Sequence, residues 1–291
     1  MALIPFDDRD GTIWYDGKLV PWRDAKLHVL THGLHYGSAV FEGERVYNGK
    51  VFELTAHSQR LIDSAHLLDI QVPWSLAEID RATIETIKAN NITEGYVRPI
   101  LWRGSEMLAV AAQATKPHLA IACWVWPDYY TKEKRLQGIK LGMADYRRPA
   151  PDTAPVKAKA AGLYMICTLS KHKAEREGFD DALMLDYRGF LAECTGANLF
   201  LIQNGEVHTP EASGFLAGIT RKTVIALALK RGLKVVERQI MPNELDSTEE
   251  VFITGTAAEI TPVNEIAGVK FQVGTITRGL IEDYEALVRG K

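Results

Sequence analysis

Three Asx-Gly dipeptides, each set between two short runs of strand-forming residues, most restrict what this chain can fold into. They are Asp16-Gly17, Asn48-Gly49 and Asn204-Gly205. Such residues readily adopt the positive φ angles of the tight turns that join antiparallel strands. The sequence therefore predicts β-hairpins both near the start of the chain and in its second half.

Four segments between the strands have helical periodicity. Ser75 with Glu78 three residues later forms a capping-box pattern, which predicts that a helix begins there. Gly178 is a typical stop for another helix. Because strands and helices alternate along the chain, we predict an α/β (mixed α+β) fold. The expected helices span residues 55–70, 75–91, 162–177 and 218–232.

The periodic pattern is interrupted after residue 125, and Pro149, Pro151 and Pro155 follow shortly. Prolines are unsuited to helix interiors and central strands. A chain of 291 residues is long enough for two ordinary domains. We therefore expect a small N-terminal α/β domain over residues 1–125, an interdomain linker over 126–146 and a large C-terminal domain over 147–291.

The composition argues against several classes of protein. The net charge is −3 and the Lys and Arg residues are scattered, which argues against nucleic-acid or membrane partners. Cys123, Cys167 and Cys194 match neither a CxxC pattern nor a disulfide framework. No stretch resembles a signal peptide or a membrane span. We expect a cytoplasmic protein.

A metal site is one candidate for function. His28, His32 and His35 are spaced by four and three residues, which could bring three imidazoles to one helix face. However, no HExxH glutamate is present, and Gly33 and Gly37 disfavour a continuous helix. We favour ordinary histidines and no metal, and keep a histidine-based metal hydrolase as the alternative.

Phosphate binding is a second candidate. In "AGITRKTV", Gly218 leads into Thr220 at a predicted helix start, where free N–H groups and the helix dipole suit one phosphate. "FITGTAA" offers a second Gly-Thr turn after a strand. Taken alone, Thr220 is better explained as a plain N-cap, and the second turn is an equally weak indication.

Two lysines form a third candidate. Lys157 and Lys159 stand one residue apart among alanines and a proline. Apolar surroundings and a neighbouring cation both favour the neutral amine that a nucleophilic lysine requires. The residues alone are equally compatible with two lysines that extend their amines to solvent.

Glu193 is a fourth candidate. In an alternating strand it shares the face of Leu191, so its carboxylate can point inward. A buried carboxylate requires a partner, either an ordinary basic side chain or a protonated pyridine nitrogen. An amine, an inward carboxylate and two phosphate-type turns are together the parts that pyridoxal phosphate requires.

Longer motifs strengthen this interpretation. The segments "KAKAAGLY", "LAECTGANLF", "LAGITRK" and "TGTAAEITPV" resemble the fold-type IV pyridoxal-phosphate enzymes, specifically the branched-chain amino-acid aminotransferases. "HGLHYGSAVFEGERVY" and "GYVRP" resemble the same family. The likeness runs in order from about Ile13 to Val263.

The resemblance implies a two-domain, D-amino-acid-aminotransferase-like fold whose second domain binds pyridoxal 5'-phosphate. Lys159 precedes Gly162 by three residues and Tyr164 by five, which matches the family's cofactor-binding lysine, whereas Lys157 does not. Glu193 would pair with the pyridine N–H and Tyr164 with the phenolate oxygen. The implied cofactor-binding residues are Arg60, Lys159, Tyr164, Glu193, Gly218, Ile219, Thr220 and Thr256.

The resemblance also implies the reaction. The enzyme would exchange amino groups between L-leucine, L-isoleucine or L-valine and 2-oxoglutarate, as a homodimer or higher homo-oligomer. Arg98 would bind the γ-carboxylate of glutamate, Tyr96 would help to hold the α-carboxylate, and Val110 would reach a neighbouring subunit's site. The implied substrate-binding residues are Tyr36, Phe41, Tyr96, Arg98, Val110, Tyr129, Thr256 and Ala257.

Other functions are also compatible with the sequence. D-amino-acid transaminases, (R)-amine transaminases and aminodeoxychorismate lyases share the fold, but "FEGER" and the Tyr96-x-Arg98 pair favour the branched-chain reaction. A non-catalytic protein that merely holds the cofactor is disfavoured because every expected reactive position is filled.

Overall fold

The computed structural model describes residues 4–126 and 132–290. By packing, the chain divides into two units. The first contains residues 1–127 and 158–162, and the second contains residues 128–157 and 163–291. The short segment 158–162 therefore belongs to the first unit although the chain around it belongs to the second.

The first unit contains an antiparallel sheet in the order β2-β1-β7-β6-β4-β5, with β3 paired to β6. The predicted hairpins at Asp16-Gly17 and Asn48-Gly49 are confirmed, because each dipeptide joins two paired strands with positive φ angles. The strands are β1 (Thr12–Tyr15), β2 (Lys18–Pro21), β3 (Ala39–Phe41), β4 (Glu44–Tyr47), β5 (Lys50–Val51), β6 (Gly95–Arg103) and β7 (Pro117–Trp124).

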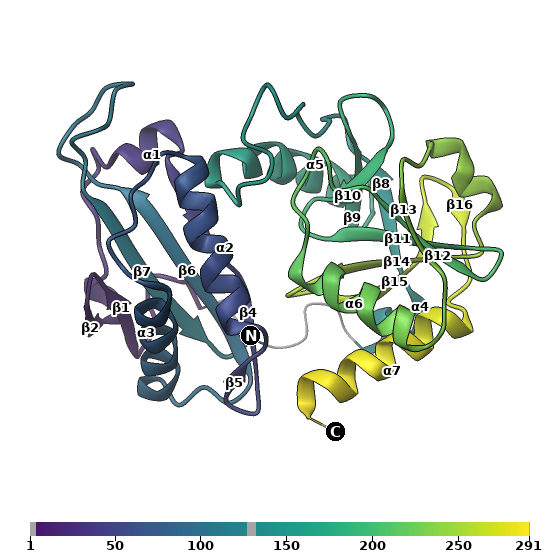
Figure 1. The fold of residues 1–291 in the computed structure, drawn as a ribbon, viewed down its shortest axis with the longest axis horizontal. Helices are drawn as coiled ribbons and strands as arrows, with labels where there is room; N and C mark the ends of the chain where they lie inside the picture. The colour runs from purple at the N-terminus through teal and green to yellow at the C-terminus, as the bar shows by residue number, and fades with distance from the viewer. Residues whose placement is uncertain (1–3, 127–131, 291) are drawn as a thin grey trace. The chain divides into compact units, whose positions relative to one another are not determined.

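Two long helices, α2 (Leu54–Leu67) and α3 (Leu76–Ala89), cover one face of this sheet (Figure 1). Leu61 and Ile79 are fully buried in the core between helices and sheet. The predicted capping box is present, since the Glu78 N–H donates to Ser75 Oγ and the Ser75 N–H donates to Glu78 Oε2. The unit also contains α1 (His32–Tyr36) and the 3-10 turn η1 (Trp22–Asp24).

The second unit contains a mixed sheet in the order β10-β9-β8-β15-β14-β11-β12-β13, with β16 paired to β15. An extra pairing of β10 with β11 brings two non-neighbouring strands of that order together. The hairpin at Asn204-Gly205 is confirmed. The strands are β8 (Ile139–Met143), β9 (Asp181–Leu185), β10 (Leu191–Cys194), β11 (Asn198–Gln203), β12 (Glu206–Pro210), β13 (Val235–Arg238), β14 (Glu250–Gly255), β15 (Glu259–Ile266) and β16 (Val269–Lys270).

The helices of the second unit pack on this sheet (Figure 1). The segment expected as one helix from residue 162 begins instead as a 3-10 turn, η2 (Ala161–Leu163), and continues as α5. Phe200 and Phe252 stack in the core with ring centroids 4.9 Å apart. The helices are α4 (Lys132–Gln137), α5 (Tyr164–Arg176), α6 (Ile219–Lys230) and α7 (Thr275–Arg289), with the 3-10 turn η3 (Pro242–Ser247).

The stretch expected as a linker, residues 126–146, contains regular structure. It includes α4 and β8, and the β8 side chains Ile139 and Leu141 are fully buried. The strand pairs in parallel with β9 and with β15. Its partner Val263 lies far along the chain, so no local pattern marks β8 as a central strand. The two-domain division by residue number stays a proposal.

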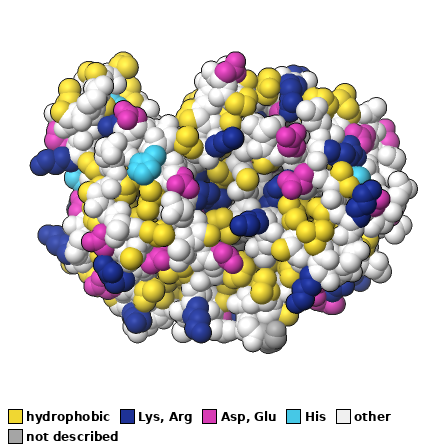
Figure 2. Space-filling view, viewed as in Figure 1, with side chains coloured by type: hydrophobic (Ala, Val, Ile, Leu, Met, Phe, Trp, Pro, Cys, Tyr) yellow, Lys and Arg dark blue, Asp and Glu magenta, His cyan; other side chains and the backbone are white. Residues whose placement is uncertain are grey.

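On the face shown in Figure 2, basic and acidic side chains are interspersed. In the part of the chain that the structure describes, no helix has the length and apolar character needed to cross a membrane.

Candidate active site

The two lysines of the "KAKAAGLY" segment have different surroundings. Lys157 is exposed, whereas Lys159 is partly buried in the first unit. Both backbone polar groups of Lys159 are bound, because its N–H donates to Ser64 Oγ (3.0 Å) and its carbonyl accepts from the Phe41 N–H (3.1 Å). An adjacent isolated bridge pairs Val40 with Ala160. The backbone of Lys159 is therefore anchored beside β3.

The amine of Lys159 and the guanidinium of Arg98 contact the same aromatic ring. Lys159 Nζ lies 5.0 Å from the ring centroid of Phe41, and Arg98 Cζ lies 4.8 Å from it. Arg98 Nη2 also donates to the Tyr96 hydroxyl at 3.4 Å. The structure thus brings four of the predicted site residues together in one unit: Lys159, Phe41, Tyr96 and Arg98.

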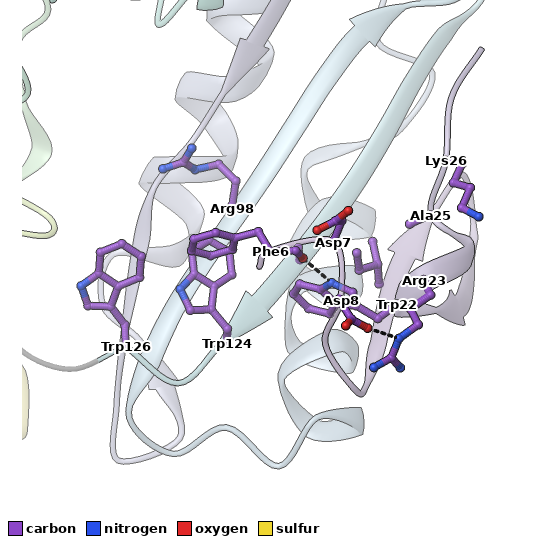
Figure 3. A pocket seen from close by; sticks show the side chains of 12 residues that line it. Phe6, Asp7, Asp8, Trp22, Arg23, Ala25, Lys26, Arg98, Trp124 and Trp126 are labelled. Carbon is purple, nitrogen blue, oxygen red and sulfur yellow. Dashed lines mark hydrogen bonds and ion pairs between the residues drawn. The ribbon is translucent and has the colours of Figure 1, made fainter. Parts of the chain in front are cut away.

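Arg98 retains a buried donor. Its Nε is inaccessible to water and has no hydrogen-bond partner among the described residues. A buried N–H group of a cation that has no acceptor is unfavourable, unless an anionic ligand accepts its hydrogen bond. Arg98 also lines a cavity of about 860 Å³ with Trp124 and Trp126, which Figure 3 shows from close by.

Gly43 explains the position of Tyr96. A Cβ built at Gly43 would overlap the Tyr96 hydroxyl, so only glycine allows the ring to lie against this turn. Tyr96 is also packed by Trp126, with ring centroids 5.2 Å apart. The "FEG" segment therefore has a structural role in setting the phenol beside Arg98.

Arg60, a predicted phosphate ligand, is held by a buried carboxylate. Glu42 Oε1 accepts from Arg60 Nε at 2.6 Å, and Oε2 accepts from Arg60 Nη2 at 2.8 Å. His57 Nδ1 donates to the same Oε2 at 2.7 Å. Arg60 and His57 together lower the pKa of Glu42 to about 2, despite its complete burial. Burial in turn lowers the pKa of His57.

Glu44, two residues further on, is buried without such partners. Neither carboxylate oxygen has a hydrogen-bond partner within the described chain. Burial, with the negative charges of Glu42 and Asp80, raises its pKa well above the ordinary value. Its surroundings therefore favour the protonated carboxyl group, beside an ionised Glu42.

In the second unit, Glu193 lies on β10 and is largely buried. Its Oε1 is 3.2 Å from Arg148 Nε, and its Oε2 accepts from Asn198 Nδ2 at 3.2 Å. The Asn198 Oδ1 accepts from the Gly218 N–H at 3.1 Å. A single amide side chain therefore connects the inward carboxylate to the turn that begins α6.

The N-terminus of α6 suits an anion. Gly218 is the N-cap and has no side chain to accept from the first N–H groups of the helix. Helix α6 has 12 residues, so its N–H groups and dipole favour a negative group at this end. Ile219 and Thr220 begin the helix, and Thr220 is buried.

The second Gly-Thr turn lies beside the same strands. Thr256 and Ala257 form the turn between β14 and β15. The β11–β14 pairing sets Asn198 opposite Thr254, and a Cβ at Gly255 would lie only 3.1 Å from the Gly196 carbonyl. The ends of β10, β11 and β14 therefore bring Glu193 and this turn to one end of the sheet.

Three other predicted residues are not part of these groups. Tyr36 is half exposed on α1 and stacks on His32. Val110 is 88% exposed on the loop between β6 and β7. Tyr164 begins α5 in the second unit. Tyr129 lies outside the described residues.

The three histidines have other partners. His32 Nε2 donates to the Ala109 carbonyl (2.9 Å), so in the neutral ring Nδ1 accepts from Ser38 Oγ (2.6 Å). His35 Nε2 donates to the Val29 carbonyl, and His28 Nδ1 accepts from the Leu30 N–H. Among the described residues, no group of His, Cys, Asp and Glu could hold a metal ion. His32 instead secures the loop that carries Val110.

Sequence reasoning missed Glu42, Asn198 and Trp126. Glu42 and Asn198 are polar residues at the ends of apolar strands, and this pattern could have marked them as candidate site residues. Their partners are set by long-range strand pairing. Trp126 follows β7 and gave no signal beyond its size.

Comparisons with known proteins identify the family of this chain. Residues 39–266 match the family described as amino-transferase class IV. A branched-chain-amino-acid aminotransferase of Pseudomonas aeruginosa is 44% identical, with 98% of this chain and 95% of that protein covered.

Solved structures give the same result. The crystal structure of the Escherichia coli branched-chain amino acid aminotransferase has a TM-score of 0.94 and 36% identity, covering 97% of this chain and 96% of that one. The branched-chain aminotransferase of the archaeon Thermoproteus uzoniensis with norvaline has a TM-score of 0.93 and 35% identity, covering 97% and 96%.

A third solved structure includes a cofactor derivative. It is a branched-chain amino acid aminotransferase of T.th. complexed with N-(5'-phosphopyridoxyl)-L-glutamate, with a TM-score of 0.92 and 35% identity, covering 97% of this chain and 95% of that one. The family and the two-domain fold type IV expected from the motifs are confirmed. The chain belongs to the class IV aminotransferases, as a member of the branched-chain-amino-acid aminotransferase family.

Proposed function

We propose that this transferase exchanges amino groups between L-leucine, L-isoleucine or L-valine and 2-oxoglutarate, giving branched 2-oxo acids and L-glutamate. One observation carries the proposal. Lys159 Nζ and Arg98 Cζ each lie within 5.0 Å of the centroid of the Phe41 ring. This arrangement suits a substrate whose α-carbon reacts near the Lys159 amine and whose second carboxylate binds the Arg98 guanidinium.

The cofactor is pyridoxal 5'-phosphate, as the family and the phosphopyridoxyl group in the T.th. complex indicate. When bound, it supplies an electron sink for the bonds at the substrate α-carbon. The residues present fit this group, because the α6 N-terminus is uncapped by any side chain and Glu193 is an inward carboxylate. The residues proposed to hold it are Arg60, Lys159, Tyr164, Glu193, Gly218, Ile219, Thr220 and Thr256.

Lys159 has the central role in this proposal. Its Nζ would bind the cofactor covalently between turnovers and, once released, take the proton from the substrate α-carbon. Anchored backbone groups on both sides limit the positions that the amine can reach. Lys157 is exposed and belongs to the second unit, and it is assigned no role.

Substrate recognition must accept an alkyl side chain and a γ-carboxylate in turn. Arg98 is proposed to bind the γ-carboxylate, because its buried Nε lacks a partner among the described residues. Tyr96 and the amides at Thr256 and Ala257 are proposed for the α-carboxylate. Tyr36, Phe41 and Tyr129 are proposed as the apolar wall, and Val110 as a residue that reaches a neighbouring subunit's site.

We also propose a homodimer or higher homo-oligomer in the cytoplasm. Leu34, Leu108 and Val110 are large apolar side chains that the first unit exposes on α1 and on the β6–β7 loop. Exposed apolar residues gathered in this way are typical of protein interfaces. The three cysteines are free and buried, which is typical of a reducing compartment.

The test is a comparison of amino donors with 2-oxoglutarate as the acceptor. We expect turnover of L-leucine, L-isoleucine and L-valine with formation of L-glutamate. D-alanine and (R)-1-phenylethylamine, the donors of the related transaminases, should react far more slowly. Failure to convert L-leucine and L-valine would overturn the proposal.

A further inference from the structure

Asn198 connects two parts of the second unit that the proposed function assigns to opposite ends of the cofactor. Its Nδ2 donates to Glu193 Oε2 at 3.2 Å and to the Leu216 carbonyl at 3.1 Å. Its Oδ1 accepts from the Gly218 N–H at 3.1 Å. We infer that Asn198 is a positioning residue that sets the separation between the ring-nitrogen carboxylate and the phosphate-binding turn. This inference rests on the proposed function.

Strand pairing holds the backbone of Asn198 on both sides. It is the first residue of β11, where it pairs with Glu193 on β10 and with Thr254 on β14. The residue is only 5% exposed. Strands on both sides hold the Cα, and three hydrogen bonds hold the amide. The positions of Glu193 and of the turn at Gly218 are therefore both set by the Asn198 side chain.

Gly218 supports the same conclusion. Its φ of −67° is ordinary for any residue, so the backbone does not require glycine here. A Cβ at this position would instead overlap the Asn198 Oδ1. Glycine at the start of α6 is therefore needed for the amide to approach the turn.

Only an amide meets all of these contacts. The side chain must donate toward a carboxylate and accept from a backbone N–H at the same time. Aspartate would keep the acceptor for Gly218 but would place a like charge beside Glu193. Alanine would remove the contacts at both ends.

The experiment measures affinities of the apo-protein for pyridoxamine 5'-phosphate and for pyridoxamine, which lacks the phosphate. Neither ligand forms a bond with Lys159, so the covalent step does not affect the result. We expect Asn198→Ala to weaken pyridoxamine 5'-phosphate by about 30-fold and pyridoxamine by about 5-fold. The phosphorylated ligand uses both ends that Asn198 positions, each at the value of about one hydrogen bond, whereas pyridoxamine uses only the Glu193 end. Asn198→Asp should weaken both ligands by the same factor.

Gly218→Ala provides an independent arm that leaves Asn198 in place. It should weaken the phosphorylated ligand more than pyridoxamine. The double variant Gly218→Ala/Asn198→Ala should bind no more weakly than Asn198→Ala alone, because the overlap with the amide is then gone. Additive losses would contradict the inference, and the single Gly218→Ala variant remains informative if Asn198→Ala does not fold.

Asn264→Ala is the matched control. Its amide also donates to two backbone carbonyls in the second unit, those of Gln137 and Gly138, without reaching Glu193. This variant should bind both ligands as the wild type does. Equal losses for the two ligands in Asn198→Ala, or none, would overturn the bridging role. A wild type that binds no pyridoxamine 5'-phosphate would instead overturn the proposed function.

Discussion

The carboxylate of Glu42 holds the guanidinium of Arg60 through two hydrogen bonds, of 2.6 and 2.8 Å. Glu42 is completely buried, and it stands between Phe41 and Gly43 in the chain, both of which contact other site residues. Because two parallel N–H···O bonds fix a planar guanidinium in both position and orientation, Arg60 has little freedom before any phosphate arrives.

Because of the Glu42–Arg60 ion pair, we expect the folded protein to lose stability at low pH. The folded-state pKa of Glu42 is lowered from 4.5 to about 2, so its contribution to stability is complete above pH 4.5 and is lost as the pH falls toward 2. The shift corresponds to about 3 kcal/mol. Urea unfolding of the apo-protein at pH 7 and pH 3 should show about 2 kcal/mol of this loss, and Glu42→Gln should remove that part of the pH dependence. Exposed Glu85→Gln is the control and should behave as the wild type.

Glu44 predicts the opposite pH dependence. Its folded-state pKa is raised, so the folded protein keeps a proton that the unfolded chain releases above pH 4.5, and stability falls as the pH rises. Glu44→Met, which is apolar and similar in volume, should increase stability at pH 8 by on the order of 1–3 kcal/mol. The gain should shrink toward pH 5 in urea unfolding. A gain that did not depend on pH would show that Glu44 is ionised in the folded state.

Replacement of Lys159 and replacement of Lys157 should have very different effects on transamination. Lys159→Ala should lower transamination by at least about 10²–10⁴-fold, because proton transfer at the α-carbon loses its base. Lys157→Ala, at an exposed position, should retain activity. Borohydride reduction of the holoenzyme followed by peptide mapping should find the label on Lys159. A label on Lys157 would contradict the assignment of the active amine.

Replacement of Arg98 should impair the reaction only of substrates that have a second carboxylate. Arg98→Gln should raise the KM for 2-oxoglutarate by about 10–100-fold, from the loss of a hydrogen bond to a charged group. Exchange between L-valine and 4-methyl-2-oxopentanoate, which needs no γ-carboxylate, should continue at close to the wild-type rate. Exposed Arg81→Gln should leave both reactions unchanged. Equal loss in both reactions would assign Arg98 to general substrate binding or to folding.

Much of the local structure could be predicted from the sequence because it depends on neighbouring residues. The turns at Asp16, Asn48 and Asn204 require backbone angles that Asx and Gly residues adopt easily. The Ser75–Glu78 capping box depends on groups three residues apart. The motifs around Lys159 were enough to indicate the family.

Only the tertiary structure decided which strands are central and which side chains meet in the candidate site, because these contacts join residues distant along the chain. Strand β8 was expected to be linker and becomes a central strand only through its parallel partners. The return of residues 158–162 to the first unit separates Lys159 from Lys157 and brings it over the ring of Phe41, which Arg98 also contacts. Hydrogen bonds such as those of Glu42 and Asn198 depend on strand register and helix packing, which a local pattern of residues does not encode.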